Sequence, residues 1–101
     1  MATYSSNTTI KIGSTISQKN SNGTPFTYTV PSDSYLSVSN ISIISYTVTI
    51  DFPSPHVTSE SYTTTTTFTP ARHFPAGTVI SCSNGGIGLG EFSGMLFTNT
   101  P

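Results

Sequence analysis

Seven side chains in this chain are of the types that commonly bind metal ions; they are His56, His73, Cys82, Asp33, Asp51, Glu60 and Glu91. A metal site needs several such ligands that converge, usually at short and characteristic spacings. These residues are scattered, and none of them shows a ligand spacing. The two histidines are expected in loops flanked by prolines. We therefore expect no metal and no cofactor, and we expect both histidines to be polar surface or interface residues.

The same residues give weak candidates for hydrolysis. A Ser–His–Asp triad can be drawn from Asp51, His73 and any of 17 serines, but so many serines allow this by chance. No serine lies in a Gly-x-Ser-x-Gly nucleophile elbow. A carboxylate pair for glycoside hydrolysis can also be drawn, although the chain has only four acidic residues and no tryptophan. We predict that the protein is not an enzyme and has no catalytic residues.

Four glycines lie close together at Gly85, Gly86, Gly88 and Gly90. A phosphate-binding loop would require a helix directly after such a run. The residues that follow have the pattern of a strand, so this run predicts a glycine-rich turn or a place where another backbone comes close.

The five tyrosines offer rings on which sugars could stack; they are Tyr4, Tyr28, Tyr35, Tyr46 and Tyr62. The competing interpretation is that most of them are half-buried strand residues with the hydroxyl at the surface. Binding of glycans therefore stays open as an alternative function.

The composition narrows the classes of partner. Charged residues make up 7% of the chain, while 19 threonines and 17 serines supply a surface of hydroxyl groups. Three cations cannot build a basic patch, which argues against nucleic acid. No apolar run reaches the roughly 20 residues of a membrane span. The polar start has no signal-peptide pattern, and a lone cysteine fits synthesis in a reducing cytoplasm.

Apolar residues recur with period two, which is typical of strands. Phe26, Tyr28 and Val30 share one parity, for example. Within 35–52 the parity slips twice, which predicts turns or bulges near Ser39-Asn40 and Ile44-Ser45. Other strands are expected over 61–69, including the five threonines 63–67, and over 78–83 and 91–98, with a loop over 18–24. The spacing predicts a single all-β domain over 1–101, an antiparallel β-sandwich or jelly-roll-like fold of seven to nine short strands.

Strand edges in such a domain need protection, because exposed edges pair with other chains. Soluble monomers usually place charges there, and this chain has few to place. We therefore expect symmetric self-association, with neighbouring subunits covering the edges.

Three segments resemble parts of small virion proteins of tailed bacteriophages. They are the start 6–13, the segment 28–38, and the Phe-Pro-Ala-Gly-Thr turn at 74–78 with the glycine-rich loop and Gly90-Glu91-Phe92 after it. The resemblance implies a trimeric β-sandwich that serves as a capsid decoration (cement) protein, a head fibre or a tail-fibre component. It offers no catalytic residues.

The leading hypothesis is a decoration protein that binds the major capsid protein on the outside of the head as a homotrimer. The runner-up is a host-recognition fibre module that binds glycans. Partner contacts are expected from an extended N-terminal arm, 1–7, and from the loop 53–60. The individual candidates are Thr3, Tyr4, Asn7, Pro53, Pro55, His56 and Glu60.

Overall fold

The computed structural model describes residues 9–10, 13–55 and 57–100, and within them every regular element is a strand. The strands are β1 Thr9–Ile10, β2 Ser14–Ser21, β3 Phe26–Thr29, β4 Ser34–Ile44, β5 Val48–Asp51, β6 Ser59–Tyr62, β7 Thr66–Pro75, β8 Val79–Cys82 and β9 Leu89–Thr100. No helix in this part of the chain is long and apolar enough to cross a membrane.

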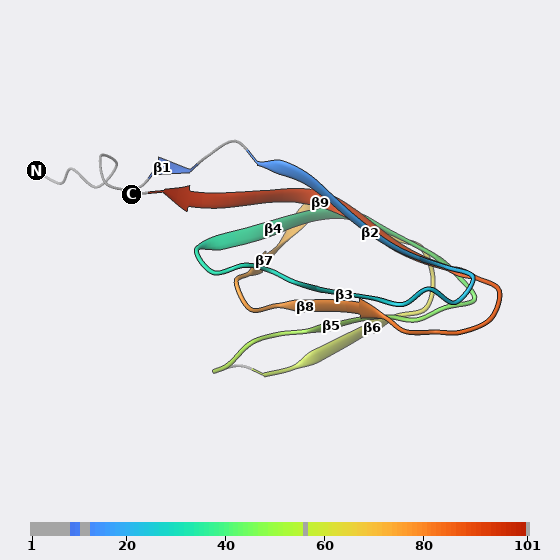
Figure 1. The fold of residues 1–101 in the computed structure, drawn as a ribbon. Coiled ribbons are helices and arrows are strands. Elements are labelled where there is room, and N and C mark those ends of the chain that lie inside the picture. Colours follow the sequence, from blue (N-terminus) through green and yellow to red (C-terminus); the bar gives the residue numbers. More distant parts are fainter. Residues whose placement is uncertain (1–8, 11–12, 56, 101) are drawn as a thin grey trace, which may run out of the picture.

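The strands form two antiparallel sheets that lie in two layers (Figure 1). One sheet has the order β1-β9-β4-β7, with β2 also paired to β9 on the side of β1. The other has the order β3-β8-β5-β6. The expected all-β antiparallel sandwich is therefore confirmed.

The core lies between the sheets and is filled by alternating residues of both. Leu36, Val38 and Phe92 of the first sheet pack with Ile50 and Ile80 of the second, and each is fully buried. Burial of such side chains stabilises the fold by about 1.5–3 kcal/mol each. The alternation of buried and exposed residues along β4 and β5 is the period-two pattern of the sequence.

Both parity slips correspond to backbone irregularities. The register of β4 shifts between Val38 and Asn40, so that Ile41 and Ile43 return to the core beyond this bulge. Ser45 has a φ of 62° and follows the end of β4, after which the chain enters the other sheet as β5. Ile44 shares the sequence parity of the buried Tyr46 and Val48, which predicts a core position, but this prediction is wrong, because Ile44 precedes the turn at Ser45 and is 61% exposed.

Three expectations about individual segments were wrong. The expected loop 18–24 is shorter, because β2 continues to Ser21 and buries Asn20. The threonine run is not one strand; residues 63–65 connect β6 of one sheet to β7 of the other. His73 lies within β7 rather than in a loop, because its backbone pairs with Ser37 of β4.

Candidate partner-binding site

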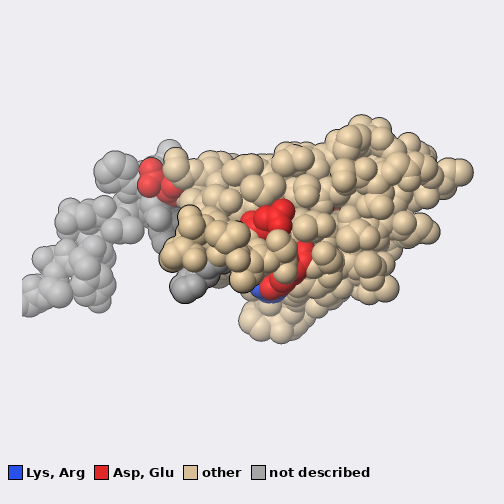
Figure 2. Space-filling model, turned by 90° about the horizontal axis from the view of Figure 1, so that it is seen from below, with Lys and Arg blue, Asp and Glu red and all other residues tan. Residues whose placement is uncertain are grey.

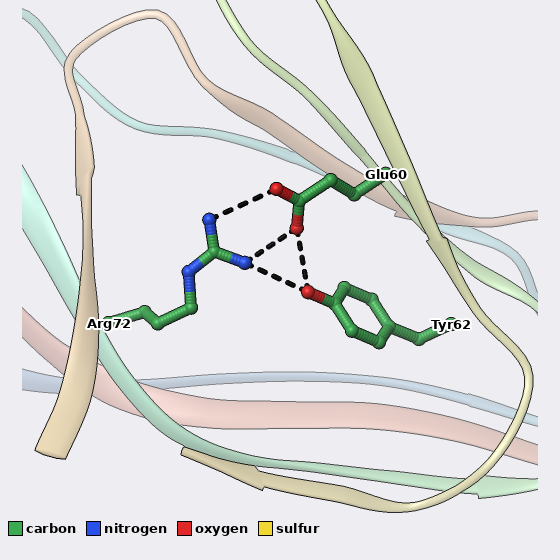
Figure 3. A network of polar contacts seen from close by, with 3 residues as sticks. All are labelled: Glu60, Tyr62 and Arg72. Carbon is green, nitrogen blue, oxygen red and sulfur yellow. Dashed lines mark hydrogen bonds and ion pairs between the residues drawn. The ribbon is translucent and has the colours of Figure 1, made fainter. Parts of the chain in front are cut away.

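A polar network joins the two sheets along the side of the sandwich where β6 and β7 are the edge strands. Arg72 of β7 donates from Nη1 to Glu60 Oε1 at 2.5 Å and from Nη2 to Glu60 Oε2 at 3.1 Å. Nη1 also donates to the Tyr62 hydroxyl at 2.8 Å, and that hydroxyl donates to Glu60 Oε1 at 2.6 Å. Figure 3 shows the three side chains converging from β6 and β7.

The strand registers explain why these side chains meet. Glu60 and Tyr62 pair with Ile50 and Val48, two core residues, so they point toward the inside of the four-stranded sheet. Arg72 pairs with Val38, another core residue, so it points toward the inside of the five-stranded sheet. A charged group facing inward at a sheet edge needs a partner. Glu60 and Arg72 satisfy this need for each other.

Three phenylalanine rings surround the guanidinium of Arg72. Its Cζ lies 5.1 Å from the ring centroid of Phe74, 5.4 Å from that of Phe68 and 5.9 Å from that of Phe52. These distances fall within the range of cation–π attraction. The Arg72 side chain therefore contacts both the carboxylate of Glu60 and the aromatic rings at the edge of the core.

The network shifts the ionisation of its members. The hydrogen bonds from Arg72 hold the pKa of Glu60 below its ordinary value, against the opposing effect of burial. The hydrogen bond to Glu60 raises the pKa of Arg72. Burial, followed by the neighbouring carboxylate, raises the pKa of Tyr62. Glu60 and Arg72 are therefore a charged pair at neutral pH, and Tyr62 stays a neutral hydroxyl.

Beside this network lies a pocket of about 530 Å³ at the end of the sandwich where β5 leads into β6 and β7 leads into β8. Its lining consists of ring and aliphatic surface with two hydroxyls and one carboxylate, from Phe52, Pro53, Ser54, Pro55, Thr58, Glu60, Pro75 and Ala76. The prolines lack backbone N–H groups and have restricted φ angles, so they supply rigid apolar walls. Such a pocket suits an apolar anchor residue of a partner.

The structure brings three of the predicted contact residues together here. Pro53, Pro55 and Glu60 all line the pocket. The expected loop 53–60 is shorter, however, because β6 begins at Ser59 and includes Glu60. Thr3, Tyr4, Asn7 and His56 lie outside the described residues.

Sequence reasoning missed the residues that complete the site: Phe52, Pro75, Ala76 and, behind the pocket, Arg72. One pattern in the sequence could have indicated Arg72. Arg72 shares its parity with Phe68 and Phe74, so it should point into the core, where a cation needs an anion as its partner. Nothing in the sequence pattern indicates that the turn at 75–77 meets the loop at 53–58. That proximity depends on the pairing of β5 with β8.

The candidates for catalysis are separated by the fold. Asp51 alternates with the buried Ile50 and so lies on the outer side of the four-stranded sheet, where it accepts a hydrogen bond from Ser59. His73 pairs with Ser37 on the outer side of the five-stranded sheet. Asp51 and His73, two members of the Ser–His–Asp triad considered from the sequence, therefore lie on opposite faces of the sandwich. Among the described residues, no three histidine, cysteine or acidic side chains gather as a metal site would require.

The glycine run behaves as expected. It forms the connection from β8 to β9 and the start of β9, and Gly88 and Gly90 lie where other groups come close. A Cβ on Gly88 would meet the carbonyl oxygen of Ile44 at 2.7 Å.

One aromatic row lies on the outer face of the five-stranded sheet. Tyr35 stacks on Phe97 of β9 with ring centroids 5.1 Å apart, and its ring lies 5.0 Å from that of His73 in β7. The other described tyrosines face the core or the network. Tyr28 packs on Phe92, Tyr46 is buried with its hydroxyl bonded to Gly86, and Tyr62 belongs to the network.

Comparison of the chain with protein-family models, curated proteins and solved structures gave no significant match.

Proposed function

We propose that this protein is a non-enzymatic structural component of a tailed-bacteriophage virion: a capsid decoration protein that binds the outside of the head as a homotrimer and stabilises it. Its partner is the major capsid protein, and its pocket receives an apolar anchor of that partner. The single observation that carries the proposal is the convergence of Pro53, Pro55 and Glu60 around one rigid, mostly apolar pocket.

The surface chemistry favours burial of this surface against other proteins. Figure 2 shows one face on which a few charged side chains interrupt an otherwise uncharged surface. Hydroxyl groups cost less to bury in an interface than charges do, provided that they find hydrogen-bond partners. Each contact of a small subunit is weak, but a trimer that engages several capsid subunits gains by multivalency.

The test is co-sedimentation of the purified protein with phage heads that lack it, together with the temperature at which these heads release their DNA. Binding and a higher release temperature are expected for the natural chain. Ala76→Phe fills the pocket and should weaken binding at least tenfold. Ala71→Phe is the matched control, because Ala71 is a half-buried alanine of β7 outside the pocket lining, and it should bind normally. Failure of the natural chain to bind any head preparation overturns the proposal.

The aromatic row favours one second function, a host-recognition module that binds cell-surface glycans. Tyr35, Phe97 and His73 present a continuous row of aromatic rings, and hydroxyl-bearing residues such as Ser37 lie on the same face. A glycan-array experiment separates the two functions. Saturable binding that is lost in Tyr35→Ser supports the glycan module, and the absence of binding supports the decoration protein.

A further inference from the structure

The chain contains two Asn-Gly pairs, Asn22-Gly23 and Asn84-Gly85, and the fold brings both to the same end of the sandwich. The first pair lies in the connection from β2 to β3 and the second in the connection from β8 to β9 (Figure 1). The two connections touch, because the backbone N–H of Asn22 donates to the carbonyl oxygen of Gly88 at 3.1 Å. An asparagine before a glycine is prone to deamidation, since glycine has no side chain to keep its backbone nitrogen away from the preceding amide.

Deamidation begins when the backbone nitrogen of the glycine attacks Cγ of the asparagine. A C–N bond forms while that nitrogen loses its proton to solvent, and the side-chain nitrogen leaves as ammonia, so that a five-membered succinimide results. Water then opens one of the two succinimide carbonyls, which gives aspartate or isoaspartate. One water is consumed, one ammonia is released, and a neutral amide becomes a carboxylate. The asparagine side chain must therefore be free to turn toward the next backbone nitrogen.

The fold holds the side chain of Asn84 in place. Its Oδ1 accepts a hydrogen bond from the backbone N–H of Thr47 at 2.9 Å. Its backbone oxygen accepts a second one, at 3.0 Å, from the amide of the fully buried Asn20. Asn84 is itself half-buried. Rotation of its amide toward Gly85 would leave the Thr47 N–H without this acceptor, and such a loss costs free energy in a partly buried place.

The side chain of Asn22 is held much less firmly. Asn22 is exposed, and its amide has one hydrogen bond to a described residue, a long one of 3.4 Å from the backbone N–H of Gly88. The space around Gly23 is open, since the nearest atom to its Cβ position is the Gly86 nitrogen at 3.6 Å. Within the described part of the chain, neither Gly23 nor Gly85 donates its N–H to an acceptor. The difference between the two pairs therefore lies in the asparagine side chains.

From these contacts we infer that Asn22 is a site of spontaneous deamidation in the folded protein and that the fold protects Asn84. The product carries one more negative charge than the chain as synthesised, whose net charge is -1. Isoaspartate also adds a methylene group to the main chain between residues 22 and 23. That insertion should weaken the hydrogen bond between Asn22 and Gly88 that joins the two connections. The reaction uses only water and the chain itself, so it does not depend on the proposed function.

The test follows both asparagines in one sample of the folded chain, kept in a mildly alkaline buffer. Trypsin cuts after Lys19 and Arg72, so the two pairs fall on separate peptides, 20–72 and 73–101. Mass spectrometry then detects the conversion of amide to carboxyl, and fragmentation assigns it to a residue. Asn22 should react about tenfold faster than Asn84 or more, because only Asn84 must break firm hydrogen bonds first.

The matched control is the same chain unfolded in guanidinium chloride. Both asparagines should then react at rates within about twofold of each other, because a glycine follows each of them. A second control is Asn20→Ala, which frees the backbone oxygen of Asn84 and should bring the rate of Asn84 closer to that of Asn22. Equal rates in the folded chain, or a folded chain in which Asn22 does not react, overturn the inference. A tenfold difference that persists in guanidinium chloride overturns the protective role of the fold.

Discussion

Arg72 and Glu60 fasten the two sheets to each other by a two-pronged ion pair, at 2.5 Å and 3.1 Å, along a side of the sandwich where neither sheet continues. Their side chains are 34% and 36% exposed, so water still screens part of the attraction. The rings of Phe68 and Phe74 hold the guanidinium in place from the core side. The pair therefore couples the wall of the pocket to the packing of the core.

The first prediction concerns the geometry of this pair. Arg72→Lys keeps the charge but loses the two-pronged hydrogen bond and most of the contact with the rings, because lysine is a point charge on a flexible stem. After allowance for screening, we expect a loss of about 1–2 kcal/mol in the free energy of unfolding. Urea denaturation measures it. Lys19→Arg in exposed β2 is the control and should change little. Equal stability of Arg72→Lys and the natural chain would show that the two-pronged hydrogen bond contributes nothing to the free energy of unfolding.

The second prediction concerns pH. The folded-state pKa of Glu60 lies below its unfolded value, so its carboxylate stabilises the fold at pH above about 4.3 and loses this effect as the pH falls through the folded pKa. Glu60→Gln has no such titration. The difference in melting temperature between the natural chain and Glu60→Gln should therefore be largest near neutral pH and shrink below about pH 4. A difference that stays constant from pH 7 to pH 3 would contradict this account.

The sandwich itself was predictable because period-two alternation is a local property of the chain. The bulge after Val38 and the turn at Ser45 were also predictable from the sequence, since each shifts the parity of the apolar residues. The pocket was predictable only in part. Pro53, Pro55 and Glu60 are near in sequence, whereas Pro75 and Ala76 reach the pocket through the pairing of distant strands. Local patterns carry no information on that pairing.

The third prediction concerns the glycine run. A Cβ on Gly90 would lie 2.5 Å from Cys82 Sγ and 3.3 Å from Val48 Cγ2, so Gly90→Ala should strain the core. We expect a loss of about 1–3 kcal/mol in the free energy of unfolding. Gly85→Ala is the matched control, because no atom lies within 4 Å of its Cβ position, and it should stay within about 0.5 kcal/mol of the natural chain. If the two variants unfold at the same urea concentration, the close approach of Cys82 to β9 is incorrect.

The fourth prediction concerns Asn20, the fully buried amide that sequence reasoning had placed in a loop. Its Nδ2 donates at 3.0 Å to the backbone oxygens of both Cys82 and Asn84, and so holds the start of the glycine-rich connection against β2. Asn20→Ala removes both hydrogen bonds and leaves a void, which should cost about 1–3 kcal/mol. Asn20→Asp should cost more, because a buried carboxylate without a partner would face two carbonyl oxygens.

The control for this pair of variants is Asn40→Ala, since Asn40 is a half-buried strand asparagine whose Nδ2 donates only to the Ser42 hydroxyl. It should lose less than either Asn20 variant. Urea denaturation gives the free energies. Amide hydrogen exchange should show faster exchange of residues 83–88 in Asn20→Ala, because this connection loses its anchor on β2. Unchanged exchange there, with a normal midpoint of unfolding, would mean that the amide of Asn20 fills space but does not hold the connection.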